Sequence, residues 1–305
     1  MAVHLALGAD AESTVEPQSP RRKPPVVVDP ILAIKRFQVP PGFKVDLFAA
    51  EPQLKNPVAF CFDEKGRCYV AETYRDRAGV LDIRGIMSWL DEDLACRTVD
   101  DRIAEMKRHL GSRLADFTKY SDQIRLLEDR DGDGRADFST VFATGFNHIE
   151  DGIGASVLAR RGNVWYTCIP DLWLLRDTDG DGVADFRQSL QHGYGVRVGY
   201  LGHDLHGLCF GPDGKLYFSI GDRAANVEND GHRVLNTESG SVFRCNPDGT
   251  GLELFCFGLR NPQQLVFDQH GNLWTGDNNS DSGDQARWVY LVEGADNGWR
   301  VGYQF

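Results

Sequence analysis

Two short loops of the chain carry aspartates at alternating positions, a pattern that could bind metal. EDRDGDGRAD begins at Glu128, and RDTDGDGVAD begins 48 residues later at Arg176. Carboxylates this close repel one another, and a hard cation such as calcium, which takes about six to eight oxygen ligands, relieves the repulsion. The candidate metal ligands are Asp129, Asp131, Asp133 and Asp137 in the first loop and Asp177, Asp179, Asp181 and Asp185 in the second.

Both loops match the start of an EF-hand calcium loop but depart from it at the end. Thr140 and Gln188 stand where the twelfth-position Glu is expected, and the sequence around each loop is not helical on both sides. We therefore expect calcium loops of another kind. An Asp-Gly turn that needs no metal remains an alternative.

A histidine and an aspartate flank one hairpin-like stretch, GHDLHGLCFGPDGKLYFSIGD. His203 comes just before its first apolar run and Asp222 just after its second. The two ends of a hairpin lie side by side, so we expect these side chains to meet. A carboxylate beside an imidazole fixes its tautomer and raises its basicity, as a general base requires. His203 and Asp222 could equally cap the strand ends, and His206 is more typical of a structural residue.

The stretch FGLRNPQQLVFD places a second polar group at the matching position before the next hairpin. Arg260 offers a planar fork for a carboxylate, and Asn261 and Gln263 add neutral hydrogen bonds. A simple turn, in which Asn261 precedes Pro262 and Arg260 is solvated, would explain the same residues.

The elements that must position these residues repeat along the chain. Four stretches share an apolar run, a glycine turn and a second apolar run: VAFCFDEKGRCYVAET, IGASVLARRGNVWYTC, LHGLCFGPDGKLYFSIGD and QQLVFDQHGNLWTGDN. The turn glycines suit hairpins because they accept positive φ at little steric cost. Each hairpin is followed by one more alternating run and preceded by another: FKVDLFAA, STVFATGF, RQSLQHGY and LELFCFGL.

Units of about four strands predict an all-β fold, a β-propeller of four-stranded antiparallel blades. We expect about four blades within residues 31–305, as a fragment of a six-bladed ring, with the aspartate loops leading from one blade toward the next. Apolar residues three to four apart predict a helical insertion at residues 82–118.

Composition narrows the possible partners. The net charge of −12 argues against nucleic acid, and no apolar run reaches the length of a membrane span. Seven cysteines show no CxxC spacing, which removes the usual zinc and haem-attachment patterns. Residues 1–30 read as a flexible tail without a clear signal peptide.

Several of these stretches resemble one family. FGPDGKLYFSIGD, GLRNPQQLVFD and DNNSDSGDQARWVYLVEGADNGW are similar in residue types, order and spacing to the soluble quinoprotein glucose and sorbosone dehydrogenases. Those proteins are six-bladed propellers that bind pyrroloquinoline quinone and calcium. PPGFKVDLFAAEP and the DGDGRAD loop look more like a bacterial branch described as membrane-bound dehydrogenases.

The resemblance implies roles for the residues that match. His203 would be the general base, Asp222 the acid that orients it, and Arg260 the contact to the quinone, with Asn261 and Gln263 as its neighbours. Asp284 falls near the family's calcium-linked acids. The chain departs from the glucose enzymes at Gly207, where they have Arg, and at Gln285, where they have a second acid.

The expected function is therefore a quinoprotein-type dehydrogenase that oxidises a sugar or another alcohol. The family would place it in the periplasm or elsewhere outside the cytoplasm, with a cytochrome-type electron acceptor. Two alternatives stay open: a calcium-dependent lactonase-like hydrolase using Asp222, Asp277 and Asp284, and a non-catalytic propeller that binds carbohydrate or protein.

Overall fold

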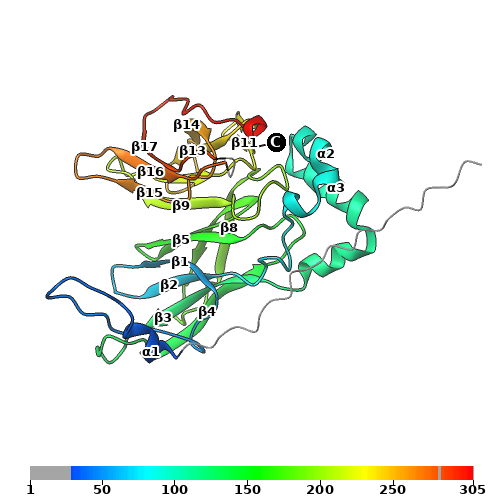
Figure 1. Cartoon of the computed structure of the whole chain (residues 1–305). Helices are drawn as coiled ribbons and strands as arrows, with labels where there is room; N and C mark the ends of the chain where they lie inside the picture. Colours follow the sequence, from blue (N-terminus) through cyan, green and yellow to red (C-terminus); the bar gives the residue numbers. More distant parts are fainter. Residues whose placement is uncertain (1–28, 281–282, 305) are drawn as a thin grey trace, which may run out of the picture.

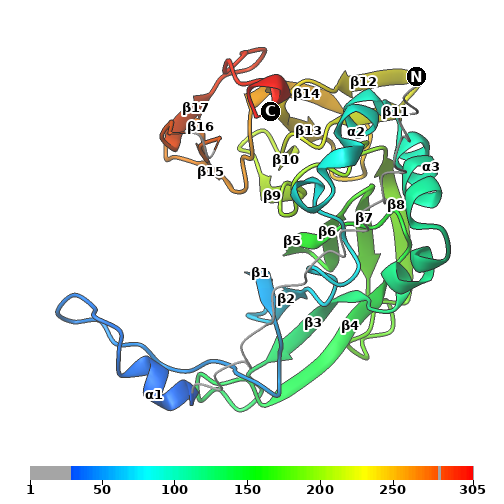
Figure 2. The same ribbon diagram turned by 45° about the vertical axis from the view of Figure 1, so that its right-hand side comes forward.

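The computed structural model describes residues 29–280 and 283–304, and most of its regular structure is antiparallel β-sheet. Four main sheets follow one another along the chain (Figure 1). They fan out as an open arc with β1, β5, β9 and β15 along its inner side (Figure 2). The predicted fold class, a β-propeller of antiparallel blades with a helical insertion, is confirmed. Apart from residues 29 and 30, the expected tail lies outside the described residues.

The first two blades have four strands each, hydrogen-bonded in chain order. Blade 1 contains β1 (Pro57–Phe62), β2 (Cys68–Glu72), β3 (Asp122–Glu128) and β4 (Phe138–Phe146). Blade 2 contains β5 (Gly154–Arg160), β6 (Asn163–Cys168), β7 (Asp171–Arg176) and β8 (Phe186–His192). Gly66 and Gly162 occupy the hairpin turns with φ of 79° and 77°, as the turn pattern requires.

Blades 3 and 4 depart from this simple order. Blade 3 contains β9 (Leu205–Phe210), β10 (Leu216–Ile220), β13 (Gly240–Cys245) and β14 (Glu253–Leu259). A separate hairpin, β11 (Ala225–Asn229) with β12 (His232–Asn236), is inserted between β10 and β13. Blade 4 has three strands in the described residues, β15 (Leu265–Phe267), β16 (Leu273–Asp277) and β17 (Arg287–Leu291).

The predicted limits of the repeating unit are wrong by one strand. The runs STVFATGF, RQSLQHGY and LELFCFGL become β4, β8 and β14, which close the preceding blade, and FKVDLFAA forms no strand. The reason is the short connection: each run returns directly beside the strand before it and pairs there. Both aspartate loops therefore join the third and fourth strands of one blade and do not lead from one blade to the next.

Each blade packs on the next through apolar side chains. An aromatic pair marks every junction: Phe146 with Tyr166 at 4.6 Å between ring centroids, Trp165 with Phe210 at 5.2 Å, and Tyr217 with Phe267 at 5.1 Å. Such a pair adds roughly 0.5–1.5 kcal/mol beyond the area that it buries. The core is thus divided among the blade junctions, so the edges of neighbouring blades are held at fixed spacing.

Helices fill the connection between β2 and β3. They are η1 (Ile83–Gly85), η2 (Met87–Trp89), α2 (Leu90–Ala95), α3 (Val99–Leu110) and η3 (Gly111–Thr118). Thr98 and Asp101 form a capping box that starts α3. Buried Ile83 and Met106 pack against Val198 and Tyr200, so this helical insertion rests on the segment that leads to His203.

Two short helical segments lie outside the insertion: α1 (Pro30–Ile34) and η4 (Val301–Tyr303). Within residues 29–280 and 283–304, no helix combines the length and the apolar character that crossing a membrane requires.

Candidate functional site

The structure brings His203 and Asp222 together at one end of blade 3. Leu205 at the start of β9 pairs with Ile220 at the end of β10, so the residues just beyond these positions are neighbours. Nδ1 of His203 lies 2.7 Å from Oδ1 of Asp222, and each residue is only 5% exposed. A carboxylate acceptor at Nδ1 holds the proton there and leaves Nε2 as the basic nitrogen. The contact predicted from the hairpin is therefore present.

Tyr200 lies between this pair and the second polar group. Its ring centroid is 5.4 Å from that of His203, and the guanidinium carbon of Arg260 lies 5.6 Å from the centre of the Tyr200 ring. Arg260 is 1% exposed, and its Nε donates to Oε1 of Gln304 at 2.7 Å. The cation is thus buried near the imidazole, where its field is screened less than in water.

The turn that carries Arg260 and Asn261 is fixed by Asp277 at the end of β16. Asp277 accepts the backbone N–H groups of Arg260 at 3.0 Å and Asn261 at 2.8 Å, and it pairs with Arg287 at 2.9 Å. Asn261 is 5% exposed, and its Oδ1 has no hydrogen-bond partner among the described residues. A buried acceptor without a partner is uncommon, and this oxygen can accept a hydrogen bond from a bound group.

Gln263 connects the two polar groups. Its Nε2 donates to the carbonyl of Gly202 at 3.3 Å, one residue before His203. A pocket of about 420 Å³ opens beside it on blade 4, and its lining includes Asn261, Gln263, Asp277, Asn278, Arg287 and Trp288. Neither His203 nor Arg260 lines this pocket. The pocket is reached from them through Asn261 and Gln263, which do line it.

Three further residues singled out in the sequence have structural explanations. Gly207 has φ of 68°, and a Cβ there would lie 3.1 Å from the Leu265 side chain, so glycine lets β9 approach β15 closely. His206 is buried and its Nε2 lies 3.0 Å from the Gly202 carbonyl, and burial lowers its pKa. Asp284 accepts both the N–H and the hydroxyl of Ser280, hydrogen bonds that lower its pKa.

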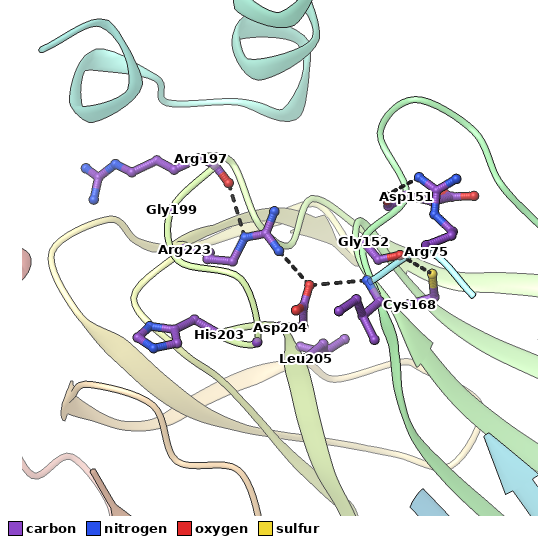
Figure 3. A network of polar contacts seen from close by, with 12 residues as sticks. Arg75, Asp151, Gly152, Cys168, Arg197, Gly199, His203, Asp204, Leu205 and Arg223 are labelled. Carbon is purple, nitrogen blue, oxygen red and sulfur yellow. Dashed lines mark hydrogen bonds and ion pairs between the residues drawn. The ribbon is translucent and has the colours of Figure 1, made fainter. Parts of the chain in front are cut away.

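A second pair beside the first was not identified from the sequence. Asp204 and Arg223 each follow a member of the His203–Asp222 pair, and Nη1 of Arg223 lies 2.5 Å from Oδ1 of Asp204 (Figure 3). Asp204 also accepts the N–H of Ile153 at 3.4 Å, and Arg223 donates to the Arg197 carbonyl at 3.3 Å. Both are almost fully buried. The hairpin register that pairs His203 with Asp222 places Asp204 opposite Gly221 and not opposite Arg223, so the sequence argument did not predict this second pair.

Arg75 is another buried cation that the sequence did not single out. It is fully buried, and its guanidinium donates to the carbonyls of Phe117, Gly79, His148 and Asp151 at 2.7–3.0 Å. Gly79 lies between β2 and the helical insertion, Phe117 at the end of the insertion, and His148 and Asp151 between β4 and β5. Figure 3 shows Arg75 beside Asp151. Arg75 therefore ties blade 1 to the entrance of blade 2.

Each aspartate loop gathers three of its four acids. Carboxylate oxygens of Asp129, Asp131 and Asp133 lie within 4.8 Å of one another, and those of Asp177, Asp179 and Asp181 do the same. The fourth acids are turned to local hydrogen bonds: Asp137 accepts the N–H of Arg130 at 3.1 Å, and Asp185 accepts that of Thr178 at 2.8 Å. Each loop therefore presents a small cluster of hard oxygen donors near the protein surface, which is a suitable donor set for calcium.

The cysteines form no disulfide among the described residues, where all seven are free thiols. Cys168, for example, is fully buried, and burial raises the pKa of its thiol. Its Sγ lies 3.7 Å from the carbonyl oxygen of Gly152 (Figure 3). Such buried thiols are typical of small core residues.

Comparisons with known proteins add the following. Quinoprotein glucose dehydrogenase B of Acinetobacter calcoaceticus is 28% identical over a match that covers 32% of this chain and 26% of that enzyme. A candidate glucose dehydrogenase from Thermus thermophilus gives a TM-score of 0.47 at 17% identity, covering 81% of this chain and 64% of that one. The pyrroloquinoline-quinone-bound aldose sugar dehydrogenase of Streptomyces coelicolor gives 0.43 at 15% identity, covering 81% and 63%.

The predicted resemblance to quinoprotein glucose dehydrogenases is confirmed by the first of these matches. The chain spans about a quarter of the length of that relative and less than two thirds of the two solved structures. A further match extends over most of the chain: the family model described as a domain of unknown function, DUF7133, covers residues 29–296. The protein therefore belongs to the DUF7133 family.

Proposed function

We propose that the protein is a quinoprotein-type dehydrogenase that oxidises a sugar or another alcohol. The observation that carries the proposal is the buried His203–Asp222 pair, with Nδ1 and Oδ1 2.7 Å apart, beside the buried Arg260. Tyr200 and Gln263 hold these groups near one another. The sequence similarity to quinoprotein glucose dehydrogenase B supports the same reaction class.

The residues present suit pyrroloquinoline quinone, which carries three carboxylates and a ring N–H. Arg260 offers a cation for a carboxylate, and Gln263 lines the adjoining pocket with an amide. Asn261 offers a buried oxygen that has no partner among the described residues and can accept an N–H. When bound, the quinone would supply the two-electron acceptor for the hydride on the alcohol carbon.

The chain itself contributes a base that accepts the substrate proton and a buried positive charge. Nε2 of His203 takes the proton of the substrate hydroxyl, because Nδ1 is engaged by Asp222. Asp222 keeps the ring in this tautomer and stabilises the imidazolium that forms. Arg260 places a buried positive charge where negative charge gathers during the reaction, and such a fixed charge needs no reorganisation.

Calcium is the second cofactor that we include in the proposal. The clusters formed by Asp129, Asp131 and Asp133 and by Asp177, Asp179 and Asp181 offer oxygen donors only. They lie between the third and fourth strands of blades 1 and 2, whereas His203 lies at one end of blade 3, so we assign them a structural role. A location outside the cytoplasm and a cytochrome-type acceptor for the electrons complete the proposed function.

The hydrolase alternative has less support from the arrangement of the acids. It needs carboxylates whose charge is free to bind a metal, whereas Asp222 is held by His203 and Asp277 forms an ion pair with Arg287. No contact of the described residues favours a purely binding role.

A reductive titration tests the proposal. The chain is reconstituted with pyrroloquinoline quinone and calcium, and aldoses and simple alcohols are added without oxygen while the quinone absorbance is followed. We expect stoichiometric reduction by at least one aldose, and much slower reduction by the same aldose in His203→Gln. Absence of reduction by every compound, although quinone is bound, would remove the proposed reaction.

A further inference from the structure

A buried carboxylate in the helical insertion lacks the partners that burial demands. Glu105 of α3 is 0% exposed, and its Oε1 has no hydrogen-bond partner among the described residues. The other oxygen, Oε2, has a thiol as its partner, Sγ of Cys96 at 3.8 Å. Burying a carboxylate in this state costs several kcal/mol, so the side chain requires either a proton or a cation.

The neighbours of Glu105 are metal-binding side chains. Single donor atoms of Asp93, Cys96 and Glu105 lie within 4.8 Å of one another, and all three residues are buried. Asp93 is held in place because its two oxygens accept the N–H groups of Val198 at 2.6 Å and Gly199 at 3.1 Å. Each of these oxygens keeps a lone pair that can still bind a cation.

The nearby arginines oppose the rise in pKa that burial causes in Asp93 and Glu105, but they do so without contacting either carboxyl. Among the described residues, neither Arg102 nor Arg197 forms an ion pair with Asp93 or Glu105. Arg102 donates to the carbonyl of Glu150 at 2.7 Å, and Arg197 donates to that of Leu94 at 3.4 Å. The Nε atoms of both arginines have no partner there. Glu105 therefore has no cation in contact among the described residues, and either a proton shared with Asp93 or a bound metal ion must balance its charge.

We propose that Asp93, Cys96 and Glu105 bind a divalent transition-metal ion of the zinc type. Zinc accepts thiolate and carboxylate ligands together, whereas calcium takes oxygen ligands. Bonds of about 2.0–2.3 Å place tetrahedral zinc ligands roughly 3.3–3.8 Å apart, and the donor atoms lie within 4.8 Å of one another, so the cluster needs to contract by about 1.5 Å at most. Water would occupy the fourth position.

A metal here would act on the position of the helical insertion. Asp93 and Cys96 belong to the end of α2 and Glu105 to α3, so the ion joins the two helices. Through Asp93 it also reaches Val198 and Gly199, which lie just before Tyr200 and His203. The role is structural and does not depend on quinone or on dehydrogenase activity.

Zinc binding in the presence of excess calcium tests the site, because calcium occupies the exposed aspartate loops first. The chelator-treated chain is titrated with zinc, and the bound metal is counted after gel filtration. We expect one more zinc equivalent in the wild type than in Glu105→Gln or Cys96→Ser. Cys209→Ser is the matched control, since Cys209 is a partly buried thiol of β9 and belongs to none of the metal-binding clusters of the described residues.

Cobalt gives a direct signature of the thiolate. The cobalt-loaded wild type and Cys209→Ser should show sulfur-to-cobalt charge-transfer absorption, and Cys96→Ser should lack it. X-ray absorption of the zinc-loaded wild type should show one sulfur neighbour and needs no variant, so a variant that fails to fold leaves the test intact. A first shell of nitrogen and oxygen alone, or equal zinc stoichiometry in all variants, would overturn the proposal and leave a proton on Glu105.

Discussion

His203 is held in place by three residues whose contacts limit its motion. Asp222 lies 2.7 Å from Nδ1, the Tyr200 ring lies 5.4 Å away between centroids, and Gly221 leaves no room for a Cβ. A Cβ on Gly221 would lie 2.7 Å from the Cβ of His203 and 2.9 Å from Oδ1 of Asn261. The imidazole and the Asn261 amide are therefore positioned against the same backbone.

Gly221→Ala should consequently disturb both groups. The added methyl meets side-chain and backbone atoms of a buried segment, so we expect a loss of roughly 1–3 kcal/mol in stability and slower turnover at unchanged substrate concentration. Thermal melting and steady-state kinetics check this. Gly85→Ala is the control, because a Cβ added there would meet no atom of a surrounding residue within 4 Å. Equal melting temperatures for both variants would contradict the packing argument.

A substitution at Asn261 should change stability and cofactor binding in opposite directions. Its buried Oδ1 lacks a partner among the described residues, and an unsatisfied acceptor costs about 1–3 kcal/mol. Asn261→Leu should therefore raise the melting temperature of the quinone-free protein and reduce the further increase that quinone produces. Differential scanning calorimetry with and without quinone measures both effects. If the variant instead melts at a lower temperature than the wild type, and quinone raises its melting temperature as much as that of the wild type, then Asn261 has another partner.

Single residues could be predicted where chain topology alone decides the contact. His203 meets Asp222 because both stand at the open end of one hairpin, which the glycine turn identifies in the sequence. The positions of Asp137 and Asp185 could not be foreseen, because each accepts the N–H of the residue seven positions earlier, across the base of its loop, and the spacing of the aspartates does not reveal this contact. Glu105 was also missed, since its burial depends on how the insertion docks.

At the scale of elements, the aspartate loops are turns that a metal would reinforce. The outer connections of blades 1 and 2 carry them, and the corresponding turn of blade 3 has Asp248, which accepts the N–H of Thr250 at 3.0 Å. Calcium that binds only the folded state adds about 2.7 kcal/mol at one hundred times its dissociation constant. The loops should therefore make stability depend on calcium.

Substitutions in each aspartate loop measure how much that loop contributes to the calcium-dependent stability. Asp133→Ala and Asp181→Ala should each remove part of the calcium-dependent rise in melting temperature, and the double variant should remove nearly all of it. Asp248→Ala should keep the full rise, even if its turn is weakened. Equal melting curves of the wild type with calcium and with chelator, at matched ionic strength, would show that the loops are ordinary Asp-Gly turns.

The connection between blades 1 and 2 should respond to pH through Asp151. Burial raises the pKa of this carboxyl from 3.8 to about 6, although the His148 N–H and Arg75 oppose the rise. Between about pH 4 and pH 6 the folded state then holds more protons than the unfolded state, so this group lowers stability as pH rises. The full change corresponds to roughly 3 kcal/mol.

Asp151→Asn removes this titration and can still accept the N–H of His148. The melting temperature of the wild type should fall relative to the variant as pH rises from 4 to 6 and then run parallel to it. The exposed Asp91→Asn serves as the control. A constant difference between wild type and Asp151→Asn across this range would show that burial does not raise the pKa of Asp151.

Across the whole molecule, repetition made the fold predictable. Four copies of a glycine-turned hairpin identified the blades, because a period of about fifty residues with short strands is typical of propellers. The hairpin β11–β12 was missed, although Asp230 and Gly231 mark its turn between alternating residues, since it falls outside the repeat. The limits of each blade were misplaced because pairing of the fourth strand is decided by proximity and not by sequence.

The central claim is that the His203–Asp222 pair accepts the substrate proton. Its most direct test is the single-turnover rate at which an aldose reduces quinone bound to the protein, without oxygen. His192→Gln is the matched control, since His192 also pairs with a carboxylate, Asp171 at 3.1 Å, but lies on β8. We expect His203→Gln to slow reduction by about 10²–10⁴-fold at unchanged quinone affinity, and His192→Gln to match the wild type. Equal rates in His203→Gln and the wild type would contradict the account.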